Sequence, residues 1–219
     1  MTGLVLKMSV SLDGFVCGPN GEIDWIFESF DPDFTVWLAE RLGRADVHIM
    51  GRRTFADMAA WWPTSTEVFA APMNAIPKAL FSRRGDVFEG TTAALRDAAA
   101  HRDRKGDSVS STSLSESWQS AEVIQGDLVE GLSSLKARYG TVLAHGGATF
   151  GQSLVASGMI DEYWLAVHPV ALGRGQPLFV TLPTALPLRL CDAEVFPSGV
   201  IAKILRPATE GVGRARSIL

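Results

Sequence analysis

The stretch Met50-Gly51-Arg52-Arg53-Thr54-Phe55 carries the strongest indication of the fold and of a ligand site. It follows the apolar run Val47-His48-Ile49, which is typical of a buried strand. Gly51 would let the backbone approach a ligand closely, and the helix after it would begin with unpaired N–H groups and a partial positive charge. These features favour a bound phosphate, with Arg52 and Arg53 as charged partners. The same residues also suit an ordinary strand-to-helix turn with exposed arginines.

Two further segments place glycine after an apolar run. Near the N-terminus, residues 4–12 read as a strand and are followed by Asp13-Gly14-Phe15-Val16. Late in the chain, Val142-Leu143-Ala144 leads into His145-Gly146-Gly147-Ala148-Thr149-Phe150. Ser82 and Arg83 end another predicted strand, which is where open α/β sheets bind ligands.

These motifs resemble, in the same order, those of the superfamily of dihydrofolate reductase and the reductase domain of bacterial riboflavin biosynthesis. Ser11–Gly14 is similar to the riboflavin-type opening, and Met50–Phe55 to the cofactor motif of dihydrofolate reductases. Phe81–Arg83 is similar to the second cofactor strand, His145–Phe150 to the third cofactor loop, and Pro169–Phe179 to the late loop. The resemblance covers about residues 4 to 206.

The resemblance implies that NADPH is the cofactor. It places the cofactor-binding residues at Gly51, Arg52, Arg53, Thr54, Ser82, Arg83, Gly146, Gly147, Ala148, Thr149 and Phe150. In dihydrofolate reductases a cis peptide bond joins the glycine pair, so a cis bond between Gly146 and Gly147 is implied too. A simple turn at this strand end is the alternative.

On the substrate side the resemblance points to Asp13 and Trp25, and the aromatic residues of the chain add Trp37. Asp13 begins a turn-rich segment that resembles the loop closing over the nicotinamide. Trp25 lies where dihydrofolate reductases have a tryptophan at the end of that loop. Trp37 would form an aromatic pocket wall with Trp61 and Trp62 if these rings face the substrate. Core tryptophans are the alternative interpretation.

The chain departs from both prototypes where the proton donor and the substrate are concerned. Asp33 is the best-placed catalytic acid, although its spacing to Gly51 is longer than in dihydrofolate reductases, and it also suits a helix-dipole partner. The riboflavin-type enzymes lack this acid and carry an Asp-x-Pro-x-Leu pattern, which is absent from Phe55–Trp62. His145 stands where those enzymes often have glutamate.

Composition fits one cytoplasmic enzyme domain. Of the 219 residues, 47% are hydrophobic, which is enough for one sizeable core, and the net charge of −4 without basic clusters argues against nucleic acid as the main partner. No apolar run approaches the ~20 residues of a membrane span, and the N-terminus lacks a signal-peptide pattern. Cys17 and Cys191 are isolated, show no metal-ligand spacing and are expected to be reduced.

The order of the elements predicts an α/β protein with the dihydrofolate reductase-like three-layer α/β/α fold. Its central sheet is expected to be mostly parallel, with antiparallel C-terminal strands. Strands are expected at 4–12, 47–50, 78–82, 122–124, 141–144, 163–170 and 200–205. Helices are expected after the N-caps Asp31 and Asp127, and over Thr149–Ser157.

Residues 1–207 are expected to form a single reductase domain. Within it, 84–117 is expected to be a partly flexible insertion because it is rich in charge, serine and threonine, and 208–219 a C-terminal tail. The long apolar strand Tyr163–Val170 near a sheet edge, together with the resemblance, favours a homodimer.

The leading hypothesis is an NADPH-dependent reductase of a small heterocyclic or carbonyl substrate. By resemblance this would be a compound like 5-amino-6-(5-phosphoribosylamino)uracil. A true dihydrofolate reductase and a non-catalytic NADPH-binding sensor or scaffold are the alternatives.

Overall fold

The computed structural model describes residues 3–82, 116–180 and 182–208. An eight-stranded sheet in the order β5-β4-β3-β6-β1-β7-β10-β9 forms its centre. These strands are β5 (Glu122–Ile124), β4 (Lys78–Phe81), β3 (Val47–Gly51), β6 (Thr141–His145), β1 (Gly3–Ser11), β7 (Glu162–His168), β10 (Ile201–Pro207) and β9 (Leu188–Val195). A second sheet joins β2 (Phe15–Cys17) to β8 (Gln176–Pro177).

The sheet confirms the predicted fold class. The strands from β5 through β7 run parallel, whereas β10 is antiparallel to both β7 and β9. The predicted strands correspond to β1, β3, β4, β5, β6, β7 and β10, and their ends differ by at most two residues. Strand β9 lies outside the predicted strands, because most of it is exposed and its apolar alternation changes phase between Leu190 and Ala193.

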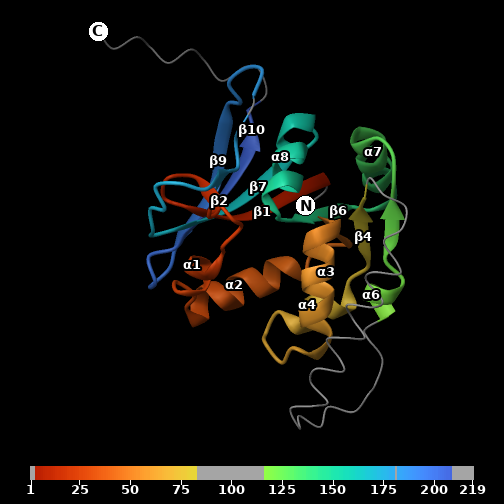
Figure 1. Ribbon diagram of the computed structural model, residues 1–219, viewed down its shortest axis with the longest axis horizontal. Helices are drawn as coiled ribbons and strands as arrows, with labels where there is room; N and C mark the ends of the chain where they lie inside the picture. The colour runs from red at the N-terminus through yellow and green to blue at the C-terminus, as the bar shows by residue number, and fades with distance from the viewer. Residues whose placement is uncertain (1–2, 83–115, 181, 209–219) are drawn as a thin grey trace.

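Helices cover both faces of the sheet (Figure 1). They are α1 (Asp24–Phe27), α2 (Pro32–Leu42), α3 (Arg52–Trp61), α4 (Ala70–Ala75), α6 (Glu116–Gln119), α7 (Leu128–Arg138) and α8 (Ala148–Ser157), with a 3-10 turn, η1 (Trp62–Thr64), after α3. The Asp31 carboxylate caps α2 by accepting from the Phe34 N–H, and Asp127 caps α7 in the same way, as predicted. In the described part of the chain, no helix is long and apolar enough to cross a membrane.

Strand alternation divides the buried side chains into two cores. Helices α2, α3, α4 and α6 pack on one face, against side chains such as Met50, Leu143 and Trp164. Helices α7 and α8 pack on the other face, against side chains such as Leu6 and Ala144. The face under α2, α3 and α4, called here the α2 face, is the one that carries polar side chains of β1, β3 and β6.

The predicted insertion at 84–117 lies almost entirely outside the described residues, as do Arg83 and the tail beyond residue 208. Its last two residues, Glu116 and Ser117, belong to α6. The next residue, Trp118, is only 1% exposed and joins the core on the α2 face. The chain is therefore packed on the core from α6 onward.

Candidate functional site

Two helices begin side by side at the carboxyl edge of the sheet. Gly51 ends β3 and is the N-cap of α3, and Gly147 follows β6 and is the N-cap of α8. Strands β3 and β6 are neighbours, and the Thr54 hydroxyl donates to the Gly146 carbonyl oxygen at 2.8 Å. Two sets of helix N–H groups and two helix dipoles therefore meet at one place, which is an arrangement suited to phosphate.

Glycine is required where these two loops touch. Gly147 has a φ of +127°, and a Cβ added there would lie 2.5 Å from Thr54 Oγ1. A Cβ on Gly146 would lie 2.6 Å from the Met8 sulfur. The implied cis bond between the two glycines is wrong, because no described peptide bond is cis. The close approach of the backbone is instead accommodated by the positive φ of Gly147.

The structure brings most of the predicted cofactor residues together. Arg52 and Arg53 are exposed on the first turn of α3, and Ala148, Thr149 and Phe150 form the first turn of α8. Ser82 follows β4, the strand next to β3, and its N–H donates to the Ile124 carbonyl oxygen at 3.1 Å. Arg83 lies outside the described residues.

Asp13 joins two loops near the same edge. Its carboxylate accepts from the Ser11 hydroxyl at 2.6 Å, from the Gly173 N–H at 2.7 Å and from the Leu172 N–H at 3.1 Å. The Ser11 hydroxyl and these N–H groups lower the pKa of Asp13, so it stays ionised. In this structure Asp13 holds the turn after β1 against the late loop.

Trp25 lies beside a buried histidine that the sequence analysis does not single out. The Trp25 ring meets His168 edge-on, with centroids 5.4 Å apart. His168, at the end of β7, is 0% exposed, and its Nδ1 lies 2.6 Å from the Ser29 hydroxyl. Burial lowers the pKa of His168 to about 4, so this imidazole is neutral at pH 7.

The predicted catalytic acid, Asp33, and the third predicted substrate-side residue, Trp37, both lie on α2. Asp33 is exposed on the first turn, and the capping role belongs to Asp31 instead. Trp37 is partly buried, with Phe34 at 6.2 Å, Phe196 at 5.7 Å and the Arg41 guanidinium 4.2 Å above its ring. Trp37 is thus packed against the antiparallel part of the sheet.

Lys7 is the residue of greatest chemical interest that the sequence analysis does not identify. It lies in the middle of β1, between His145 of β6 and Trp164 of β7, and its side chain is partly buried on the α2 face. Burial lowers the pKa of Lys7 to about 8. Lysine and serine alternate with apolar residues at Lys7, Ser9 and Ser11, and this polar stripe within an apolar strand is the signal that could have found it.

Lys7 lies near two imidazoles. Its charge contributes to lowering the pKa of both His145 and His168, which places it within electrostatic range of each. Among the described groups, no carboxylate contributes to the pKa of Lys7, His145 or His168. The α2 face at Lys7 is therefore suited to a substrate atom that is negative or gains negative charge.

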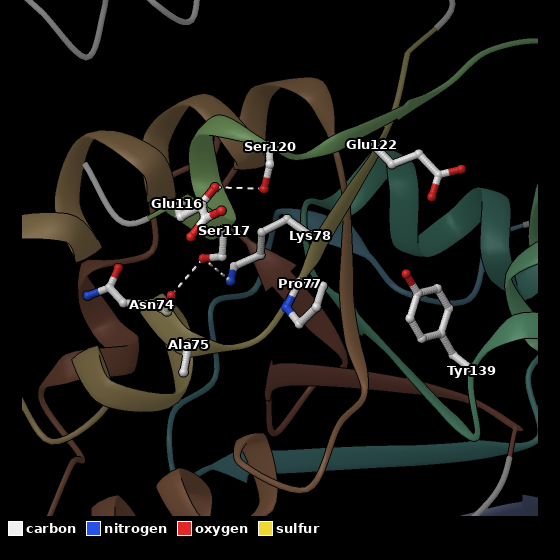
Figure 2. Close-up of a pocket in the computed structure, with 9 residues that line it drawn as sticks. All are labelled: Asn74, Ala75, Pro77, Lys78, Glu116, Ser117, Ser120, Glu122 and Tyr139. Carbon is white, nitrogen blue, oxygen red and sulfur yellow. Dashed lines mark hydrogen bonds between the residues drawn. The ribbon is translucent and has the colours of Figure 1, made fainter. Parts of the chain in front are cut away.

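A cavity of about 500 Å³ opens at the opposite, amino edge of the parallel strands (Figure 2). Lys78, at the start of β4, lines it and donates to the Ile76 carbonyl oxygen and, at 3.2 Å, to the Ser117 hydroxyl. Its ammonium also lies 4.6 Å from the centre of the Trp118 ring. Lys78 thus holds α6 against the sheet, away from the carboxyl edge.

Acid is expected to destabilise the protein well before its carboxylates are protonated. Burial lowers the pKa of His48 to about 3, that of His168 to about 4 and that of His145 well below its usual value. The unfolded chain takes up these protons below about pH 6.5 and the folded chain does not. The stability that depends on these three neutral histidines is therefore full above pH 6.5 and is lost as pH falls from there toward 4.

Each histidine contributes up to about 1.4 kcal/mol per pH unit, so the three together give a slope of about 4 kcal/mol per unit. Urea unfolding at pH 7.5, 6 and 5 measures this slope. His168→Gln serves as the matched variant and should lower the slope by about a third. An unfolding free energy that does not change between pH 7 and 5 would contradict the burial of neutral imidazoles.

Comparison with known proteins places this geometry in context. The family model of the RibD C-terminal domain matches residues 2–202. The uncharacterized protein YyaP of Bacillus subtilis (strain 168) is 27% identical over 199 residues, which cover 90% of this chain and 91% of YyaP.

Two solved structures share the fold. RibD of Acinetobacter baumannii has a TM-score of 0.64 at 18% identity, and the match covers 95% of this chain and 59% of RibD. Dihydrofolate reductase of Enterococcus faecalis, solved in complex with NADP(H), has a TM-score of 0.56 at 12% identity, and the match covers 94% of this chain and 97% of that enzyme. At these identities the likeness establishes the dihydrofolate reductase-like fold.

Proposed function

The chain belongs to the RibD C-terminal domain family, a family of reductases, and we propose that it is an NADPH-dependent reductase. The substrate is a small heterocyclic or carbonyl compound, with one like 5-amino-6-(5-phosphoribosylamino)uracil as the first candidate. The single observation that carries this proposal is the pair of helix N-termini at Gly51 and Gly147, tied together by Thr54.

The described residues fit the proposed cofactor. The pyrophosphate would accept from N–H groups on the first turns of α3 and α8, and Gly147 leaves the space that a side chain would fill. Arg52 and Arg53 are free to reach a ribose phosphate from the exposed start of α3. The E. faecalis enzyme of the same fold was solved with NADP(H), which supports this assignment.

When bound, NADPH would supply the hydride, and the chain must then supply a proton and hold the substrate. We assign the role of proton donor to Lys7. With a pKa of about 8, its side chain is mostly protonated at neutral pH and is acidic enough to give the proton up. Among the described groups, no carboxylate contributes to the pKa of Lys7, which favours a substrate whose carbonyl or imine becomes electron-rich during reduction.

Asp33 is the competing proton donor and belongs to the alternative of a true dihydrofolate reductase. Its exposure on the first turn of α2 supports the helix-dipole role more than the catalytic one. Asp33→Asn should therefore keep most of the reductase activity. A loss of activity as large as that of a Lys7 variant would instead identify Asp33 as the proton donor.

The experiment that tests the function combines binding with turnover. NADPH binding is measured by fluorescence titration, and NADPH oxidation is followed with a panel of pyrimidines, pteridines and small carbonyl compounds. Oxidation with one class of compound identifies the substrate. Tight NADPH binding without turnover of any compound would favour the non-catalytic sensor or scaffold.

We expect the protein to prefer NADPH over NADH. Arg52 and Arg53 stand one turn from the pyrophosphate position, where a charge-assisted bond to the ribose phosphate contributes about 1.5–3 kcal/mol. Arg52→Ala and Arg53→Ala should weaken NADPH binding about ten- to a hundredfold and leave NADH binding unchanged. Equal affinity of the parent protein for the two cofactors would contradict the assignment.

We also propose a homodimer in the cytoplasm. The strand predicted to mediate contact, β7, lies inside the sheet between β1 and β10, so the available surface lies on β9 and β10 instead. On the side of these two strands that faces the same way as α7 and α8, Leu190 is 55% and Val195 72% exposed. Sedimentation at micromolar concentration should show a dimer, and Val195→Glu should yield a monomer. A monomeric parent protein would contradict this assembly.

A further inference from the structure

Four titratable side chains cross the α2 face of the sheet in a row. Lys7 of β1 pairs in register with His145 of β6, and His48 of β3 pairs in register with Lys78 of β4. The two imidazoles bridge the row, since their ring centroids lie 4.6 Å apart at an interplanar angle of 74°. The row therefore runs from the proposed proton donor into the interior.

The direction of hydrogen bonding is fixed at the inner end. His48 Nε2 lies 3.1 Å from the Leu42 carbonyl oxygen, and a carbonyl only accepts, so Nε2 must carry the hydrogen. Burial, together with the charge of Lys78, lowers the pKa of His48 to about 3, so the ring is neutral. Its Nδ1 is then a bare acceptor, and it is a buried atom without a partner.

His145 offers the complementary atom. It is 3% exposed, and its Nε2 is also buried and unpaired. Burial and the neighbouring charges lower its pKa well below the usual value, so it is neutral and carries one N–H. A buried donor or acceptor without a partner is unfavourable. The structure leaves both atoms unpaired, and because the two ring centroids are only 4.6 Å apart, a hydrogen bond from His145 Nε2 to His48 Nδ1 would satisfy both at once.

We propose that His48 is a positioning residue that accepts from His145 Nε2–H and thereby leaves His145 Nδ1 as an acceptor for the Lys7 ammonium. In this series of hydrogen bonds, Lys7 donates to His145, His145 donates to His48, and His48 donates to the Leu42 carbonyl oxygen. The remaining protons of Lys7 are then directed away from the strand that carries His145. The effect of this hydrogen-bonded series on turnover rests on the proposed reductase function. The hydrogen bonds themselves do not depend on that function.

Imidazole tautomers can be read directly by long-range ¹⁵N–¹H NMR on histidine-labelled protein at pH 7.5. The chain has 4 histidines, so variants in which one histidine at a time is replaced assign the signals. His48 and His145 are both expected as neutral Nε2–H tautomers. A neutral Nδ1–H form or an imidazolium at His145 would overturn the proposal. This measurement uses the unmodified protein and needs no substrate.

Two substitutions at His48 separate a positioning role from simple packing. His48→Leu removes the acceptor, so His145 should become a mixture of tautomers and turnover should fall about tenfold. His48→Gln can still donate to Leu42 and accept from His145, so it should keep the Nε2–H tautomer and most of the turnover. His168→Gln alters another buried imidazole near Lys7 and should leave the His145 tautomer unchanged.

The same data distinguish this inference from the proposed function. If no compound is reduced but the wild-type tautomers are as expected, the reductase assignment fails and the hydrogen-bonded chain stands. If turnover occurs but His48→Leu leaves both the tautomer of His145 and the rate unchanged, the positioning role of His48 is wrong.

Discussion

Replacing Lys7 with methionine is expected to lower the rate of NADPH-dependent reduction by about 10²–10⁴-fold, the range typical of a lost general acid. Cofactor affinity should remain, because the proposed phosphate contacts lie on α3 and α8. The same variant should be more stable than the parent protein. Burial lowers the pKa of Lys7 to about 8, so the folded state disfavours a charge that the unfolded chain holds in water.

The gain in unfolding free energy should be roughly 3 kcal/mol at pH 7, measured by urea titration. Lys78→Met is the matched control, because Lys78 is also a buried lysine, with a pKa lowered to about 7, but lines the cavity at the amino edge. This control should keep the parent rate of reduction. Parent-like turnover in Lys7→Met would show that the proton comes from another group.

Replacing Gly147 with valine should weaken NADPH binding at least a hundredfold. A Cβ at this position would lie 2.5 Å from Thr54 Oγ1, and the φ of +127° strains any residue with a side chain. The substitution therefore breaks the Thr54–Gly146 bond and separates the two helix N-termini, so that one phosphate group can no longer reach both. Fluorescence titration with NADPH measures the loss.

Two further variants show whether the separation of the helices is the cause. Gly158→Asn places a side chain at the other end of α8, where φ is +67° and the added Cβ meets no atom within 4 Å, so binding should remain. Thr54→Val removes only the bridging hydroxyl and should weaken binding to an intermediate degree. If a folded Gly147→Val protein binds NADPH with unchanged affinity, the glycine pair is only a turn and does not contribute to cofactor binding.

Local sequence patterns were sufficient to predict the frame of the fold and the start of each long helix. Apolar runs bounded by turn residues identified the parallel strands, because burial on both faces leaves few polar positions in them. Asp31 and Asp127 identified α2 and α7, because an N-cap contacts N–H groups only two or three residues away. The strand ends and helix starts at Gly51 and Gly147 were also anticipated, since strand, glycine and helix follow one another directly in the chain.

Strand β9 and the surroundings of Lys7 depended on the tertiary structure. β9 is a strand because it pairs with β10, and its own side chains carry little apolar pattern. Trp118 directly follows the predicted insertion, and it is buried because α6 packs against Lys78.

The sequence by itself determined the family, the parallel sheet and the two strand-glycine-helix junctions at which we propose phosphate binds, since each depends on residues that are close together along the chain. Only the tertiary structure decided that Lys7, His48 and His145 form one row. These residues are separated by some 40 to 140 positions along the chain and meet solely because β1, β6 and β3 are adjacent in the sheet. Their pKa values follow from the same cause, because burial and neighbouring charges exist only once the strands have paired and the helices have covered them.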